Sequence, residues 1–232
     1  MSAELVDRAA TVLGPVLDEV VFLGGATVHL WVTESAAPPV RATEDVDVIC
    51  EAATLAAYHR LGRRLRQCGL TEAIDEPVIC RWRSRDPELL FDVMPTDPRI
   101  LGFSNRWYPA AIADAKEVTL ASGARIRAAR PTLLVATKLA AWNGRGRGDL
   151  LRSLDIHDVL TLIDARPELR DEFTRADPDV RGYVRTELTS LVGHRHFEYA
   201  IDSATGGYGA VARERSKVLH ERVERLLVAL TP

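Results

Sequence analysis

Cysteine is scarce in this sequence, and its spacing argues against two classes of small protein. Cys50, Cys68 and Cys80 are the three cysteines, and no two of them form a C-x-x-C pair. Disulfide scaffolds and zinc ribbons need more cysteines or closer pairs, so neither class is expected. This cysteine usage fits a reducing compartment, and we expect a cytoplasmic protein.

Long apolar runs and an excess of positive charge are also missing. No apolar stretch approaches the length that spans a membrane, and the first residues lack the pattern of a secretory signal, so no membrane partner is expected. The net charge is −3, so any nucleic-acid contact must come from a local patch. Arginine supplies nearly all the positive charge, a bias that phosphate contacts and a GC-rich genome would each produce.

The order of strand-like and helix-like segments predicts an α+β protein in two parts. The chain has 232 residues, 47% of them hydrophobic, which is enough for one large domain or two modest ones. Strand patterns concentrate before residue 130, and helical patterns follow, including two long helices over 178–203 and 210–230. We therefore predict a domain with a mixed sheet over residues 1–130 and a helical domain over residues 131–232.

Two aspartates stand one residue apart in the segment RATEDVDVIC, residues 41–50. The apolar residues around Asp45 and Asp47 predict a buried strand, in which residues i and i+2 share a face. Asp92 stands alone in a second apolar strand, LLFDVMP. Carboxylates of this kind hold hard divalent cations, Mg²⁺ or Mn²⁺, that assist phosphoryl transfer. The alternative is that all three face solvent on half-exposed strands.

Gly24 and Gly25 stand where a predicted strand over EVVFL meets a predicted helix over ATVHLWVTE. Glycines allow close backbone approach, and the N-terminus of a helix favours anions. The turn is therefore a candidate phosphate seat, although such turns also occur for purely structural reasons.

Charged residues after position 130 form a second group of candidates. Lys138 lies in an apolar helical segment, where it either snorkels to solvent or faces triphosphate oxygens. Asp155 lies near the start of the next predicted helix, where it either favours the helix dipole or orients Lys138 or an incoming group. Arg145 and Arg147 lie among glycines in NGRGRGD and either grip nucleotide or RNA or belong to a solvated connection.

Three of these segments together resemble the signature of the polymerase-β-like nucleotidyltransferases. That signature is a Gly-Gly or Gly-Ser turn, a D-x-D strand and a later single aspartate, present here as FLGGATVHLWV, RATEDVDVIC and LLFDVMP. The resemblance extends over roughly residues 20–165. Two departures are a Gly-Gly turn where many relatives have Gly-Ser, and a longer loop between Gly25 and Asp45.

A narrower resemblance concerns the toxin-like AbiEii/MenT branch, found in bacterial toxin–antitoxin systems. The pattern R-x-T-x-D-V-D, with Arg41 and Thr43 before the two aspartates, is similar to that branch. Matched by position, the motif lysine and the later motif aspartate of the branch fall on Lys138 and Asp155. The resemblance implies a cognate antitoxin protein and transfer to the 3′ end of tRNA.

The resemblance implies a metal-dependent transferase that moves a nucleoside monophosphate from an NTP to an acceptor hydroxyl and releases pyrophosphate. The residues would act as metal ligands (Asp45, Asp47, Asp92), as the triphosphate seat (Gly24, Gly25, Thr27), as further phosphate contacts (Arg41, Thr43, Lys138), as an orienting carboxylate (Asp155) and as RNA contacts (Arg145, Arg147). Alternatives are transfer to a small antibiotic-type molecule, a nuclease, and a nucleotide-binding or antitoxin-type partner protein without turnover.

Overall fold

The chain folds into two compact units. The structure is a computed structural model that describes residues 2–52, 54–75, 77–85, 88–145, 148–207 and 209–231. The first unit comprises residues up to His29 together with Arg41–Arg130, and the second comprises Leu30–Val40 together with the chain from Pro131 on. The boundary after residue 130 coincides with the predicted one, but residues 30–40, which the prediction gave to the first domain, belong to the second unit.

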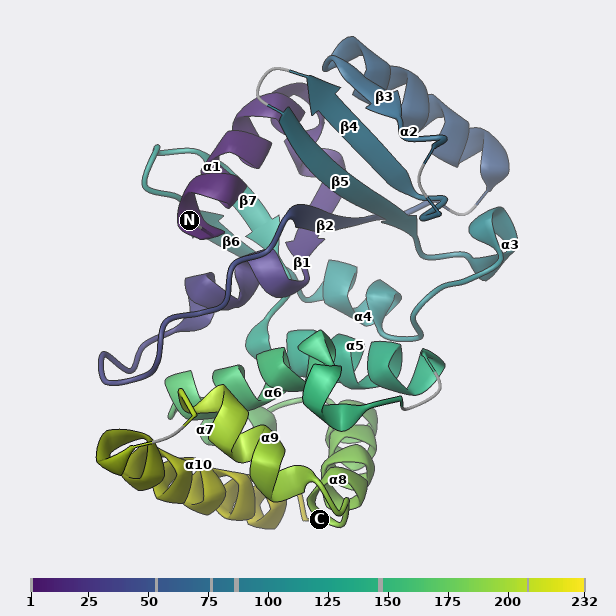
Figure 1. Cartoon of the computed structure of the whole chain (residues 1–232). Coiled ribbons are helices and arrows are strands. Elements are labelled where there is room, and N and C mark those ends of the chain that lie inside the picture. Colours follow the sequence, from purple (N-terminus) through teal and green to yellow (C-terminus); the bar gives the residue numbers. More distant parts are fainter. Residues whose placement is uncertain are drawn as a thin grey trace. The chain divides into compact units, whose positions relative to one another are not determined.

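A mixed sheet forms the centre of the first unit, with strand order β3-β4-β5-β2-β1-β7-β6 among the described residues (Figure 1). The strands are β1 (Val20–Leu23), β2 (Asp45–Cys50), β3 (Leu70–Glu72), β4 (Arg81–Arg85), β5 (Glu88–Pro95), β6 (Lys116–Thr119) and β7 (Arg125–Ala128). The pairs β2–β5 and β1–β7 are parallel, and the others are antiparallel. The predicted α+β class with a mixed sheet is confirmed.

Helices precede and connect these strands: α1 (Ser2–Leu13) and η1 (Gly14–Glu19) come before β1, and η2 (Gly25–Trp31), α2 (Leu55–Gln67), α3 (Pro98–Leu101) and α4 (Tyr108–Ala113) lie between strands. Thr54 caps the N-terminus of α2, because its hydroxyl accepts a hydrogen bond from the Ala57 amide, and such a cap satisfies an otherwise unpaired helical N–H group. The prediction of an ordinary helix over 26–34 is wrong, because η2 is a 3₁₀ helix that ends at Trp31.

The second unit is built of helices around α6 (Leu154–Ala165), which packs against α5, α9 and α10. The other helices are α5 (Pro131–Gly144), η3 (Leu150–Arg152), α7 (Leu169–Thr174), α8 (Pro178–Val192), α9 (Phe197–Ala204) and α10 (Ala210–Ala229). In α6, nearly every residue is buried. In the part of the chain that the structure describes, no helix is both long and apolar enough to cross a membrane.

The predicted single helix over 178–203 is wrong, because the chain leaves the helix after Val192. Gly193 follows α8, and the His196 amide then donates to Nδ1 of His194. Glycine is a poor helix former, and a side chain that bonds to the local backbone competes with helical hydrogen bonds. The chain therefore turns there, and α9 begins at Phe197.

Candidate active site

Three aspartates of the first unit lie on one face of the sheet. Asp45 and Asp47 are two residues apart in β2, so they share a face. In the parallel pairing of β2 with β5, Asp47 lies opposite Asp92, and residues directly opposite each other point to the same side. Val46 and Val48, which point to the other side, are fully buried. We call Asp45, Asp47 and Asp92 the carboxylate site.

Gly24 is required by the close approach of its backbone to Asp47. Its φ angle is 77°, and a Cβ atom built on it would lie 1.8 Å from Oδ2 of Asp47. No other amino acid fits this position without moving the turn or the carboxylate. The carboxylate of Asp47 therefore lies directly against the glycine turn that ends β1.

Thr27 holds this turn in shape. The side chain is fully buried, and its hydroxyl donates a 2.9 Å hydrogen bond to the Gly24 carbonyl. The Thr27 amide bonds to the same carbonyl three residues back, which is the spacing of a 3₁₀ helix. Because η2 is a 3₁₀ helix of seven residues, the glycine turn itself, rather than a helix N-terminus, is what remains of the predicted phosphate seat.

Arg81, which the sequence reasoning missed, lies between two of the three aspartates. In the antiparallel pairing of β4 with β5, Arg81 is directly opposite Asp92. Its Nε and one terminal nitrogen donate to the two oxygens of Asp92 at 2.8 Å and 2.9 Å. The same terminal nitrogen donates to Oδ2 of Asp45 at 2.7 Å. One guanidinium therefore joins carboxylates from two neighbouring strands and offsets their mutual repulsion.

The segment just before β2 contains two of the three further predicted phosphate contacts, Arg41 and Thr43. The hydroxyl oxygen of Thr43 is buried and has no hydrogen-bond partner among the described residues. A buried hydroxyl without a partner is costly, so a ligand atom would stabilise it. Arg41 donates a 3.3 Å hydrogen bond to the Ala42 carbonyl at the surface of the unit.

Negative charge from this site reaches a buried thiol nearby. Burial, together with the nearby charges of Asp92 and Asp47, raises the pKa of Cys80 to about 12. The Cys80 carbonyl also accepts a hydrogen bond from the Val93 amide, at 2.9 Å, next to Asp92. Cys80 therefore stays a neutral thiol at physiological pH and adds no charge to the carboxylate site.

The carboxylate site has the oxygen ligands that a hard divalent cation needs, but these oxygens do not point at a common cation position. Within the described residues, no group of three or more His, Cys, Asp or Glu side chains is placed to hold a metal ion. Asp45 and Asp92 direct their oxygens at the Arg81 guanidinium instead. Because three carboxylates share one face and Asp45 is 35% exposed, Mg²⁺ or Mn²⁺ fits this donor set once the guanidinium moves.

Lys138 lies in a second charged group, entirely within the second unit. Its ammonium is 2.8 Å from Asp158 and 3.3 Å from Asp155, and all three side chains are buried. We call these three residues the lysine cluster. The snorkelling alternative for Lys138 is therefore wrong. Arg145 also contacts Asp155, and Ser153 caps α6 through the Ile156 amide. This contact places Asp155 beside Lys138, and the orienting role of Asp155 stays a prediction.

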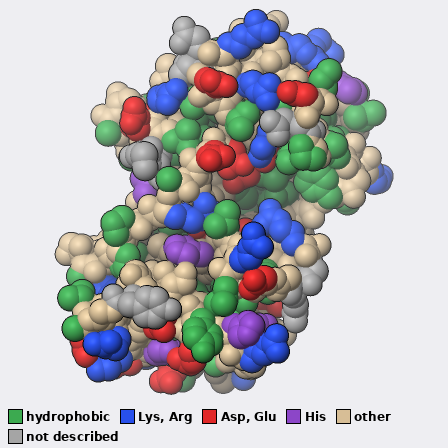
Figure 2. All heavy atoms as spheres, in the orientation of Figure 1, with side chains coloured by type: hydrophobic (Ala, Val, Ile, Leu, Met, Phe, Trp, Pro, Cys, Tyr) green, Lys and Arg blue, Asp and Glu red, His purple; other side chains and the backbone are tan. Residues whose placement is uncertain are grey.

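The structure describes one of the two predicted RNA contacts. Arg145 is 71% exposed and pairs with Asp155, whereas Arg147 lies outside the described residues. On the face drawn in Figure 2, basic and acidic side chains are interspersed, and the described residues form no continuous basic surface there. Any RNA contact on this face therefore depends on individual arginines.

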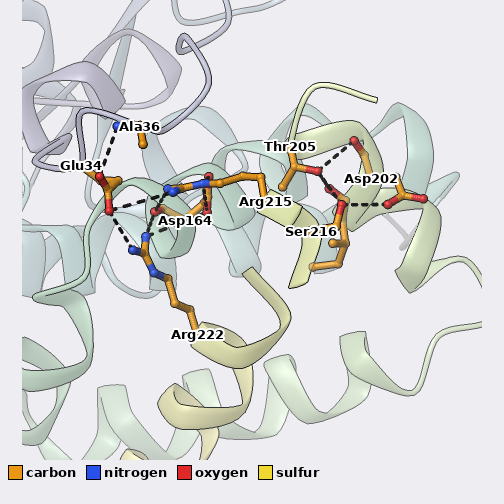
Figure 3. A network of polar contacts seen from close by, with 9 residues as sticks. Glu34, Ala36, Asp164, Asp202, Thr205, Arg215, Ser216 and Arg222 are labelled. Carbon is orange, nitrogen blue, oxygen red and sulfur yellow. Dashed lines mark hydrogen bonds and ion pairs between the residues drawn. The ribbon is translucent and has the colours of Figure 1, made fainter. Parts of the chain in front are cut away.

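The sequence analysis did not predict a third charged group, which is drawn in Figure 3. We call its charged residues Glu34, Asp164, Arg215 and Arg222 the α10 network. From α10, Arg215 donates to Asp164 at 2.8 Å and Arg222 donates to Glu34 at 3.0 Å. Burial raises the pKa of Asp164, an effect that the charge of Arg215 opposes. Hydrogen bonds from the Ala36 amide and from Arg222 lower the pKa of Glu34. The network ties residues 30–40 to the helices of the second unit.

Comparisons with known proteins add no family to this geometry. No protein-family model and no curated protein matches the chain. The resemblance to the nucleotidyltransferases therefore remains a hypothesis, and the functional argument depends on the carboxylate site, the glycine turn and Arg81.

Proposed function

We propose that this protein is a metal-dependent nucleotidyltransferase. The observation that carries the proposal is the register of β2 with β5, in which Asp47 lies opposite Asp92 and shares a face with Asp45. The glycine turn supports it, because Gly24 leaves room for the Asp47 carboxylate, and a side chain at position 24 would collide with that carboxylate. Three carboxylates beside a glycine turn suit the transfer of a phosphoryl group better than a purely structural role.

In this proposal each residue has a defined task. Asp45, Asp47 and Asp92 hold Mg²⁺ or Mn²⁺, which when bound would stabilise the negative charge that develops on the phosphates. Asp92 accepts the proton of the acceptor hydroxyl. At the same time the hydroxyl oxygen of the acceptor forms a bond to the α-phosphorus, and the bond from the α-phosphorus to pyrophosphate breaks. The Gly24–Gly25 backbone and the Thr43 hydroxyl contact phosphate oxygens, and Thr27 keeps the turn in shape.

For the acceptor we propose the 3′ end of tRNA, with a cognate antitoxin as protein partner, following the AbiEii/MenT resemblance. RNA binding through phosphates weakens steeply with salt. For single strands, the logarithm of the binding constant falls with the logarithm of the salt concentration, with a slope of roughly 0.7 per phosphate contact. Exchanging Arg145 and Arg147 for alanine should then lower transfer to RNA and flatten its salt dependence. Arg152→Ala, an exposed arginine in η3, is the matched control.

The test is incubation of the purified protein with each α-labelled NTP, Mg²⁺ and either total RNA or a panel of small hydroxyl compounds, at two salt concentrations. Label on RNA supports the tRNA acceptor, whereas label only on a small compound supports an antibiotic-type transferase. The Asp47→Asn variant is the control for contaminating enzymes. If neither acceptor takes label with any NTP, the transferase proposal is wrong.

A second candidate function is that of a nucleotide-binding partner protein without turnover. The observation in its favour is the pairing of Arg81 with Asp45 and Asp92, since a permanent guanidinium offsets part of the negative charge of the site without a metal. Such a protein would bind an NTP, measured by equilibrium dialysis, with the same affinity in the presence of Mg²⁺ or of EDTA. Loss of binding in EDTA would contradict this candidate.

A further inference from the structure

Arg81 donates hydrogen bonds to carboxylate oxygens that a metal ion at this site would coordinate. Its guanidinium lies 2.7–2.9 Å from one oxygen of Asp45 and both oxygens of Asp92. The side chain is only 14% exposed, and the two-oxygen contact to Asp92 is the strongest geometry for such a pair. Arg81 thus offsets the repulsion between carboxylates on β2 and β5.

This position is incompatible with a cation on the same oxygens. A divalent ion on Asp45 and Asp92 would occupy the space of the guanidinium nitrogen that bridges them, and the two positive charges would repel each other. Arginine cannot release its proton at any ordinary pH, so the guanidinium yields the site only by moving away. Asp45 is the more exposed of the two partners, at 35% against 12% for Asp92.

We propose that Arg81 and the divalent cation are alternative occupants of the carboxylate site. Arg81 holds the metal-free site together, and the cation binds by displacing it from Asp45 and Asp92. This inference rests on the proposed function. It implies that the apparent metal affinity is lowered by the fraction of molecules in which the guanidinium occupies the site. The protein would then bind metal only when the local concentration of metal, alone or with NTP, is high.

The first test is titration calorimetry of the full chain with Mn²⁺ in the absence of nucleotide. Arg81→Met should bind Mn²⁺ at least about tenfold more tightly than the wild type, because the competitor is gone. Arg81→Lys, which keeps the charge but lacks the planar guanidinium that contacts both oxygens of Asp92, should fall between them. Arg125→Met is the matched control, since Arg125 forms an exposed ion pair with Glu117 in the same unit.

The melting temperature separates competition from a merely structural role. Without metal, Arg81→Met should melt below the wild type, because the repulsion between Asp45 and Asp92 is no longer offset. Saturating Mn²⁺ should restore most of the loss in Arg81→Met. A structural arginine would give the same loss without this rescue and without tighter Mn²⁺ binding.

If Arg81→Met does not fold, the wild type alone decides the question by nuclear magnetic resonance. The Nε–H signal of Arg81, assigned through its bonded carbon and nitrogen nuclei in isotope-labelled wild type, should change on Mg²⁺ addition and saturate with metal binding. An unchanged signal while metal binds would overturn the inference, and so would equal Mn²⁺ affinities in wild type and Arg81→Met. Absence of metal binding in every variant would overturn both this inference and the metal dependence of the proposed function. Competition without nucleotide transfer would overturn only the proposed function.

Discussion

The carboxylate site and the lysine cluster differ in how far water reaches their charges. In the carboxylate site, the Asp45 side chain is 35% exposed and one arginine joins two aspartates. In the lysine cluster, Asp158 is 1% exposed and Asp155 is 6% exposed, and both face Lys138. The first group is therefore open to exchange of its cation, whereas the second is closed around it.

This difference separates groups that can react from groups that hold the fold. Removing one partner of a buried ion pair leaves an uncompensated charge and is strongly destabilising. An accessible carboxylate can instead lose its charge with little change in stability. We therefore expect substitutions in the carboxylate site to change activity, and substitutions in the lysine cluster to change stability.

The largest effect is expected for Asp47→Asn. The amide keeps the size of the side chain but removes the negative charge that a metal needs, so transfer should fall at least about a thousandfold, or about 4 kcal/mol. The melting temperature should stay close to that of the wild type. The measurement is NTP turnover per folded protein. Asp114→Asn, an exposed carboxylate of the same unit that pairs with Arg130, should keep full activity; near-normal turnover of Asp47→Asn would contradict the metal-ligand assignment.

The second effect concerns Lys138→Met. Removing the ammonium that Asp155 and Asp158 face should lower the free energy of unfolding by about 3–5 kcal/mol. Lys217→Met is the matched control, because Lys217 forms an exposed pair with Glu214 and should cost at most about 1 kcal/mol. Urea unfolding measures both. Equal midpoints for the two variants would show that the lysine cluster is not a closed structural group.

Turnover of Lys138→Met, corrected for the folded fraction, also tests the predicted phosphate contact of Lys138. A structural lysine would leave the KM for NTP unchanged in the folded molecules. A phosphate contact would raise it.

A smaller effect is expected for Gly24→Ala. The backbone strain of a non-glycine residue at positive φ should cost about 1–2 kcal/mol, and the new Cβ would also collide with Asp47. Gly102→Ala is the control, because Gly102 has a φ of 79° but nothing within 4 Å of its Cβ position. Thermal unfolding should show a larger loss for Gly24→Ala, and only this variant should lose activity. Equal losses of thermal stability in the two variants, with full activity in both, would mean that Gly24 is needed only for its backbone conformation.

The sequence contained more of the carboxylate site than its motifs revealed. The D-x-D strand and the lone Asp92 predicted which residues gather, and the β2–β5 pairing brings them to one face. Arg81 was missed although the register was predictable. Arg85 pairs with Glu88, and counting outward from that pair places Arg81 opposite Asp92. That the guanidinium would also reach Asp45 depends on side-chain direction, which spacing does not give.

Residues 30–40 show where local patterns lose their predictive power. Their contacts come from distant parts of the sequence: Thr33 donates to Glu168, and Arg222 donates to Glu34. No periodicity within the segment indicates these partners, so a boundary drawn from the order of strand and helix patterns put the segment in the wrong unit. The split between α8 and α9 was likewise missed, because a single glycine in a helical pattern is an ambiguous signal.

The smallest effects are expected in the α10 network, whose two carboxylates should respond to pH in opposite directions. Hydrogen bonds from the Ala36 amide and from Arg222 hold the pKa of Glu34 below its ordinary 4.5. Its contribution to stability is therefore present above that pH and is lost as the pH falls through the folded-state pKa. Glu34→Gln removes this loss, so its melting temperature should fall less than that of the wild type between pH 6 and pH 4.

Asp164→Asn should show the opposite change over the same pH range. Burial raises the pKa of Asp164 above its ordinary 3.8, so the folded state holds this proton more tightly than the unfolded state does. Its favourable contribution is complete below pH 3.8 and is lost as the pH rises through the folded-state pKa. Without it, the melting temperature should fall more steeply on acidification than in the wild type. Differential scanning calorimetry of the three proteins at matched ionic strength measures the slopes, and slopes displaced in the same direction would mean that the network titrates as one unit.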